Sequence, residues 1–135
     1  MKKYFSLPNE IFCLNLSCGE IAVYAYLLFR EDRKTYQCYP SYKTIGEAVG
    51  ISKNTVKKYV DSLRKKHLIE TEQTQVTLKN GRKRNGNLRY TIRPIKEAVQ
   101  YHLEQQMMRQ DEELQRQKIL KKLADYDRKH GKKAV

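Results

Sequence analysis

Two groups of basic residues dominate the central part of the chain. The first recurs along residues 53–65, and the second occupies residues 79–89 without an acidic residue among them. Lysine and arginine at this density bind phosphate, and together with asparagine they also hydrogen-bond the edges of nucleic-acid bases. The candidate binding residues are Ser52, Lys53, Asn54, Thr55, Lys57, Lys58, Arg64, Lys65, Lys79, Arg82, Lys83, Arg84 and Arg89.

The charge of the whole chain points in the same direction. Its 135 residues include 28 Lys and Arg against 15 Asp and Glu, which gives a formal net charge of +13, and residues 41–93 alone carry +9. Such a balance indicates a polyanionic partner, either nucleic acid or an anionic membrane surface. With 39% hydrophobic residues the chain can bury only a modest core, which excludes a large metabolic enzyme built around an enclosed cofactor.

No membrane segment is expected, because the mostly apolar stretch 11–29 is interrupted by Asn15, Ser17 and Glu20. Its longest apolar run, residues 21–29, has nine residues, whereas a spanning helix needs about 20. We therefore expect nothing in the chain to span a membrane or to anchor it to one.

The sequence offers no constellation typical of catalysis. His67, His102 and His130 lie far apart, and the three cysteines include no second pair at metal-ligand spacing. We therefore expect a protein that is not an enzyme and that has no metal site and no cofactor. Three thiols without a disulfide framework indicate a reducing, cytoplasmic location.

Helix-capping residues show where the first helix begins. Ser17-Cys18-Gly19-Glu20 is a capping box, in which the Ser17 hydroxyl and the Glu20 carboxylate each take a backbone amide. The spacing predicts a helix over about residues 18–31 whose buried stripe consists of Ile21, Tyr24, Ala25, Leu28 and Phe29.

Two further helices are predicted in close succession. Ser41 is placed to cap a helix over 42–49, which Gly50 ends, and Ser52 caps a helix over 53–66. Because the link is so short, the two helices must cross sharply. The inward residues of the later helix are expected to be Val56, Tyr59, Val60 and Leu63.

Beyond residue 68 the pattern changes to alternating, Thr-rich segments. Residues 69–77 and 88–92 predict two strands of a hairpin with a basic tip. Asn80-Gly81 and Asn85-Gly86 both tolerate positive φ, so the turn lies at either pair or in a longer loop that spans both.

The last segment, about 95–128, contains neither Pro nor Gly and predicts one long helix. At about 33 residues it would extend roughly 50 Å, more than a domain of this size can cover. We therefore expect a homodimer through this helix, the alternative being a helix that frays beyond about Met108. The broken apolar seam consists of Val99, Leu103, Met107, Leu114, Leu120 and Leu123.

This order of elements resembles the bacterial winged helix-turn-helix domains of transcription regulators and of plasmid or phage replication initiators. The resemblance implies a mainly α fold with a small β-hairpin wing, formed by residues 1–93, followed by a long C-terminal helix over 94–135 that serves as a dimerisation extension with a frayed end. The family often has Gly where His67 stands. The matching residues are Pro40-Ser41, Ile45-Gly46, Gly50-Ile51-Ser52, Thr55-Val56, Leu63, Leu68-Ile69 and Asn87-Leu88-Arg89-Tyr90.

The resemblance implies that the third helix enters the major groove of double-stranded DNA while the wing contacts the backbone. Asn54 suits adenine, the lysines suit guanine or phosphate, and the first turn suits a phosphate. Asp61, four residues from both Lys57 and Lys65, is expected to form ion pairs within the helix. Steps of 100° put opposite Val56 the residues Asn54, Lys57, Lys58, Asp61 and Lys65, with Lys53 and Arg64 towards the side.

Three functions remain open on the sequence alone. The favoured one is a sequence-specific DNA-binding transcriptional regulator. The second is a replication initiator or accessory DNA-binding protein of a plasmid, phage or conjugative element, which shares the same kind of domain. The third is a non-catalytic protein-interaction scaffold whose basic face meets an acidic partner.

Overall fold

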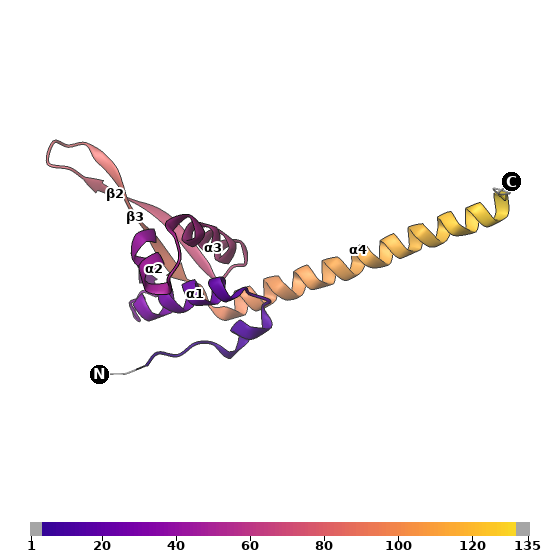
Figure 1. Cartoon of the computed structure of the whole chain (residues 1–135), viewed down its shortest axis with the longest axis horizontal. Helices are drawn as coiled ribbons and strands as arrows, with labels where there is room; N and C mark the ends of the chain where they lie inside the picture. The colour runs from indigo at the N-terminus through magenta and orange to yellow at the C-terminus, as the bar shows by residue number, and fades with distance from the viewer. Residues whose placement is uncertain (1–3, 132–135) are drawn as a thin grey trace. The chain divides into compact units, whose positions relative to one another are not determined.

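The chain folds into helices and a small antiparallel sheet, here described from a computed structural model for residues 4–131 (Figure 1). The fold class predicted from the sequence, mainly α with a hairpin wing and a long C-terminal helix, is confirmed. In chain order the elements are η1 (Asn9–Cys13), α1 (Cys18–Arg30), β1 (Gln37–Cys38), α2 (Tyr42–Val49), α3 (Lys53–Lys65), β2 (Ile69–Thr77), β3 (Lys83–Ile92) and α4 (Ile95–His130).

The predicted serine caps begin the helices α1, α2 and α3. The Ser17 hydroxyl accepts a hydrogen bond from the Glu20 amide at 3.2 Å, Ser41 accepts from the Thr44 amide at 3.0 Å, and Ser52 accepts from the Thr55 amide at 3.3 Å. Gly50 ends α2 in the left-handed conformation, with a φ of 78°. Each cap satisfies an amide that the first turn would otherwise leave without a partner.

The buried face of α1 differs from the predicted stripe. Val23, Tyr24 and Leu27 are buried, whereas Phe29 is 61% exposed and contacts Phe5 with the ring centroids 5.8 Å apart. The prediction of Phe29 in the core is therefore wrong. Apolar residues occur almost all round α1. The helical period of about 3.6 residues therefore predicts the spacing of the buried residues, but which face of α1 is buried depends on the helices packed against it.

One buried carboxylate joins the beginning of α1 to the end of α3. Glu20 is 6% exposed, and its carboxylate accepts hydrogen bonds from Lys66 Nζ at 2.9 Å, from Ser62 Oγ at 3.0 Å and from the Ser17 amide at 3.2 Å. Burial alone raises the pKa of Glu20, but the hydrogen bonds from Lys66, Ser17 and Ser62 outweigh it, so the pKa lies below its ordinary value.

The sheet has the strand order β1–β3–β2, with both pairs antiparallel. β1 contains two residues, and Cys38 is the partner of Tyr90 in β3. The sequence did not predict this strand, because two residues carry no period. Ile69 and Ile92 pair at the base of the hairpin and are both buried, which fixes the register of β2 against β3.

The hairpin turn lies at Asn80-Gly81, since Gly81 has a φ of 81° and β3 already begins at Lys83. Asn85-Gly86 lies inside β3, where two residues, Gly86 and Asn87, stand opposite the single Thr74. This is a β-bulge, and β3 therefore starts five residues before the predicted position.

His67 stands where winged helix-turn-helix domains often have glycine, and it adopts the left-handed conformation itself, with a φ of 65°. Its backbone amide donates to the Arg64 carbonyl at 3.1 Å, and its ring stacks on Tyr101 with centroids 4.3 Å apart. Strand β2 therefore starts at Ile69, as the sequence predicts. The stacking of His67 on Tyr101 and its hydrogen bond to Arg64 offset the free-energy cost of the left-handed conformation for a histidine.

The chain divides into two compact units, residues 1–101 and residues 102–135. The first two turns of α4 belong to the first unit, where Ala98 is buried. The second unit is the remainder of α4, which is helical up to His130 and is not frayed beyond about Met108, as the alternative prediction had it. Within residues 4–131, no helix is both long and apolar enough to cross a membrane.

We expect Glu20→Gln to destabilise the protein by about 1–2 kcal/mol at neutral pH, since the amide keeps the cap but loses the ion pair with Lys66. Because the folded pKa is lowered, this stability is present above the ordinary value of 4.5 and disappears as the pH falls through the lower, folded value. Urea unfolding between pH 3 and 7 measures the difference.

The matched control is Glu10→Gln, at an exposed position of η1, which should leave the unfolding free energy unchanged. An undiminished difference between wild type and Glu20→Gln at pH 3 would contradict the ion-pair account.

Candidate nucleic-acid interface

The exposed side of α3 carries most of the first basic group. Val56, Val60 and Leu63 are buried on the opposite side, as predicted, whereas Tyr59 is half-buried. Thr55 is also half-buried. The candidate residues of this segment with exposed side chains are Ser52, Lys53, Asn54, Lys57, Lys58, Arg64 and Lys65.

A close approach between α2 and the start of α3 presents this surface. A Cβ atom added to Gly46 would lie 2.5 Å from the Ile51 carbonyl oxygen, so only glycine fits there. The Gly46 carbonyl in turn accepts hydrogen bonds from the amides of Gly50, at 2.8 Å, and Ile51, at 3.0 Å. The turn is therefore held by backbone contacts, and Ser52 starts α3 directly after it.

Arg64 is held at the edge of α3 by its own neighbours. Its guanidinium pairs with Asp61 at 3.3 Å and donates to the Thr71 hydroxyl of β2, also at 3.3 Å. Asp61 thus forms an ion pair within the helix, as predicted, but with Arg64 rather than with Lys57 or Lys65. The two lysines keep their charges free of an ion pair within residues 4–131.

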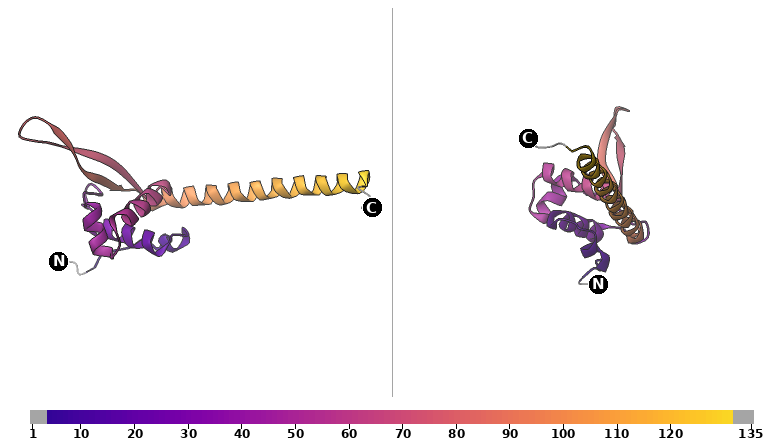
Figure 2. Two further views of the ribbon diagram at one scale, coloured as in Figure 1. Left: turned by 45° about the horizontal axis from the view of Figure 1, so that its top comes forward. Right: turned by 90° about the vertical axis from the view of Figure 1, so that its right-hand side faces the viewer.

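The hairpin β2–β3 extends beyond helices α2 and α3 and forms the wing (Figures 1 and 2). Four basic residues at and near its tip are exposed and form no ion pair within the part of the chain that the structure describes. They are Lys79, Arg82, Lys83 and Arg84.

Arg89 has a different environment from the other basic residues of the wing. It is half-buried and pairs across the strands with Glu72, which is its partner in the register. Arg93 similarly pairs with Glu70 at 3.4 Å and with Glu97 at 2.6 Å. Arg89 therefore stabilises the sheet, and among the candidate residues it is the one whose charge is neutralised by an acid of the same sheet.

A groove of about 380 Å³ lies between the start of α2, the exposed side of α3 and the base of the wing. The sequence alone does not reveal this groove, because its residues come from four separate segments of the chain. Lys57 is the one candidate residue in its lining, which consists of Pro40, Ser41, Tyr42, Lys57, Gln73, Gly86, Asn87, Leu88 and Tyr90.

Two tyrosines of this groove keep their protons at neutral pH. Burial raises the pKa of Tyr90, and the nearby Tyr42 raises it further. Burial and the charge of Asp61 likewise raise the pKa of Tyr42. The Tyr90 hydroxyl is buried and makes no hydrogen bond within residues 4–131. Tyr42 and Tyr90 therefore contribute no charge to the groove, and its positive charge comes from Lys57.

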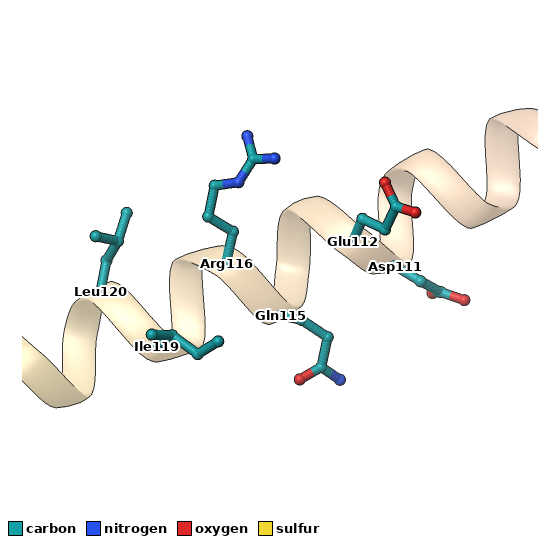
Figure 3. A pocket seen from close by; sticks show the side chains of 6 residues that line it. All are labelled: Asp111, Glu112, Gln115, Arg116, Ile119 and Leu120. Carbon is teal, nitrogen blue, oxygen red and sulfur yellow. The ribbon is translucent and has the colours of Figure 1, made fainter.

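A second hollow, along residues 111–120 of α4, is of another kind. Its side chains all come from successive turns of one helix and point away from it in different directions (Figure 3). Such a surface encloses no ligand. Across the described residues, no three His, Cys, Asp or Glu side chains gather where they could hold a metal ion.

Residues 14–69 match a family described as a helix-turn-helix domain. The matched segment contains α1, α2 and α3, and with the hairpin β2–β3 these helices form a winged helix-turn-helix fold, as the sequence predicted. No curated protein matches the sequence.

Two solved structures are similar to the chain. One is a possible transcriptional regulator from Methanosarcina mazei Go1, with 22% identity, a TM-score of 0.49, and coverage of 83% of this chain and 88% of that chain. The other is a MarR-family transcriptional regulator from Silicibacter pomeroyi, with 16% identity, a TM-score of 0.43, and coverage of 93% of this chain and 80% of that chain.

We expect Gly46→Ala to destabilise the helix-turn-helix domain by about 1–3 kcal/mol, since the new Cβ pushes the Ile51 carbonyl away and shifts α3 against α2. Thermal unfolding measures the loss. The control Glu47→Ala, an exposed neighbour on the same helix, should change stability by less than about 0.5 kcal/mol. Equal stability of Gly46→Ala and wild type would contradict the close approach.

Proposed function

We propose that this protein binds double-stranded DNA at specific sequences, with α3 in the major groove and the wing on the flanking backbone, and regulates transcription by occupying its site. The observation that carries the proposal is the coincidence of a helix-turn-helix domain with two exposed basic surfaces in one compact unit, on α3 and on the wing. An exposed surface of this charge gains affinity by releasing counterions from DNA.

On α3, three residues have the chemistry to read bases. Asn54 offers the paired donor and acceptor that adenine presents in the major groove, and Lys57 and Lys58 reach guanine acceptors or phosphates. Ser52, Lys53 and Thr55, at the start of the helix, suit a phosphate at its positive end. We assign Arg64 and Lys65 to the flanking backbone.

In the wing, Lys79, Arg82, Lys83 and Arg84 supply contacts to phosphates beside the site. Arg89 contributes indirectly, because its ion pair with Glu72 joins the two strands that carry these residues. Phosphate contacts set the position of the protein on the duplex and do not themselves read sequence.

We further propose that residues 94–135 join two copies into a homodimer, with residues 1–93 acting as the DNA-binding part. α4 has 36 residues, a length of about 54 Å, and exposes Leu103, Met107 and Leu114 at helical spacing. A second copy would bury these side chains, and two copies suit a two-fold symmetric site. The three free thiols favour a reducing compartment such as the cytoplasm.

The double variant Lys57→Ala/Lys58→Ala tests the DNA-binding proposal. We expect its affinity for random-sequence duplex DNA to fall, and the slope of log affinity against log salt between about 50 and 200 mM to become shallower by about one for each lysine that touches a phosphate. Fluorescence anisotropy with the full-length protein measures both quantities.

The charge-matched control is Lys34→Ala/Lys96→Ala, at two exposed lysines outside α3 and the wing. Wild-type protein that does not bind DNA would overturn the proposal in favour of a protein-binding scaffold. Selected sites that occur as repeats at an origin, rather than as a palindrome at a promoter, would favour a replication initiator.

Leu114→Glu tests the homodimer. A charge at this position should prevent burial of the apolar residues of α4, so we expect a monomer where the wild type is a dimer. Multi-angle light scattering at equal protein concentrations gives the mass directly. Gln115→Glu adds the same charge at an exposed position about 100° round the helix from Leu103, Met107 and Leu114, and it should leave the dimer intact. A monomeric wild type would contradict the dimer.

A further inference from the structure

Two amide side chains face each other in the outer part of the wing. Gln75 of β2 and Asn85 of β3 are partners in the register, so their side chains lie on the same face with Cβ atoms about 5 Å apart. Both are exposed, and neither side-chain amide makes a hydrogen bond within residues 4–131.

Two other amides in the wing, by contrast, are engaged in holding it together. The Gln73 amide donates to the Gly86 carbonyl at 2.7 Å, across the bulge. The Asn87 amide donates to the Tyr39 carbonyl at 3.1 Å, outside the hairpin. Gln75 and Asn85 therefore have no comparable structural task, and their donors and acceptors are available to a partner.

The register shows which face of the wing carries this pair. β2 runs without an extra residue, so Gln73 and Gln75 share one face, and the bulge in β3 brings Asn85 to that face as well. Gln73 lines the groove together with Lys57 of α3. The amide pair thus continues the face of the hairpin that is turned towards α3.

The opposite face of the outer wing differs in chemistry. This face carries the side chain of Val76. Gly86 lies close to that side chain, since a Cβ added to Gly86 would be 3.1 Å from Val76 Cγ2. Arg84 is the register partner of Val76 and shares that face. The α3-facing side of the outer wing is the one with two free amides and, one pair further along, Thr77 and Lys83.

An amide pair of this kind has a defined complement in DNA. Glutamine and asparagine match the N6 donor and N7 acceptor of adenine in the major groove, which is wide enough for a two-stranded ribbon, whereas the minor groove of about 6 Å is not. We propose that Gln75 and Asn85 hydrogen-bond the major-groove edge of adenine beside the bases that α3 contacts. This inference rests on the proposed function and makes the wing a reader of sequence.

Selection of binding sites from a random duplex library tests the inference with the full-length protein. We expect the wild type to enrich adenine at a position beside its central site, and Gln75→Ala/Asn85→Ala to lose that preference and to bind the wild-type site about tenfold more weakly. The salt slope should stay the same, because the variant removes no charge.

A modified base tests the same contact without changing the protein. Replacing the selected adenine by 7-deazaadenine removes the N7 acceptor, and we expect the wild type to lose about tenfold in affinity while the double variant loses nothing further. Val76→Thr, on the opposite face of the wing, should retain the wild-type preference and affinity.

Wild-type binding that is indifferent to 7-deazaadenine, or a double variant with an unchanged adenine preference, would overturn this inference and leave the proposed DNA binding intact. Failure of the wild type to bind any duplex would overturn both.

Discussion

The geometry of the helix-turn-helix depends on the close approach of α2 and the start of α3 at Gly46. The Ile51 carbonyl oxygen lies 2.5 Å from the position that a Cβ on residue 46 would take, and Gly50 adds the left-handed turn that leads into Ser52. Because these contacts are made by backbone atoms, the backbone of the turn sets the direction in which α3 leaves it. The buried face of α3 then fits the core, and its basic face is exposed as a consequence.

A second constraint is that some charged residues form ion pairs that hold the fold together, whereas others are exposed and unpaired in the part of the chain that the structure describes. Two ion pairs form within the first unit: Glu20 with Lys66 joins α1 to the end of α3, and Arg89 with Glu72 joins the two strands of the hairpin. Arg64 is held by Asp61. The lysines of α3 and the basic residues at the wing tip have no such partners within residues 4–131. Much of the net charge of +13 therefore comes from basic residues of α3 and the wing tip that form no ion pair among the described residues, and these are the surfaces that a polyanion would contact.

The bulge in β3 gives the wing its two different faces. Without the extra residue opposite Thr74, the side chains of β3 beyond Asn87 would exchange faces, and Asn85 would lie with Val76 rather than with Gln75. Gly86 fits at this point because Thr74 and Val76 lie directly over it, with Thr74 Oγ1 only 2.6 Å from the position of an added Cβ. Gly86 thus permits the bulge, and the bulge determines which side chains of the outer part of β3 lie on the face towards α3.

The sequence by itself determined the helix starts, the short α2, the hairpin and the length of α4, because capping hydroxyls, glycines and periodicity act on neighbouring residues. It also identified the basic residues of α3 and the wing tip. Only the tertiary structure decided that Phe29 is exposed while Val23 is buried, that Arg89 pairs with Glu72, and that Lys57, Tyr42 and Gln73 line one groove. These outcomes depend on contacts between residues far apart in the chain, and a local pattern carries no information about which distant side chain will be the neighbour.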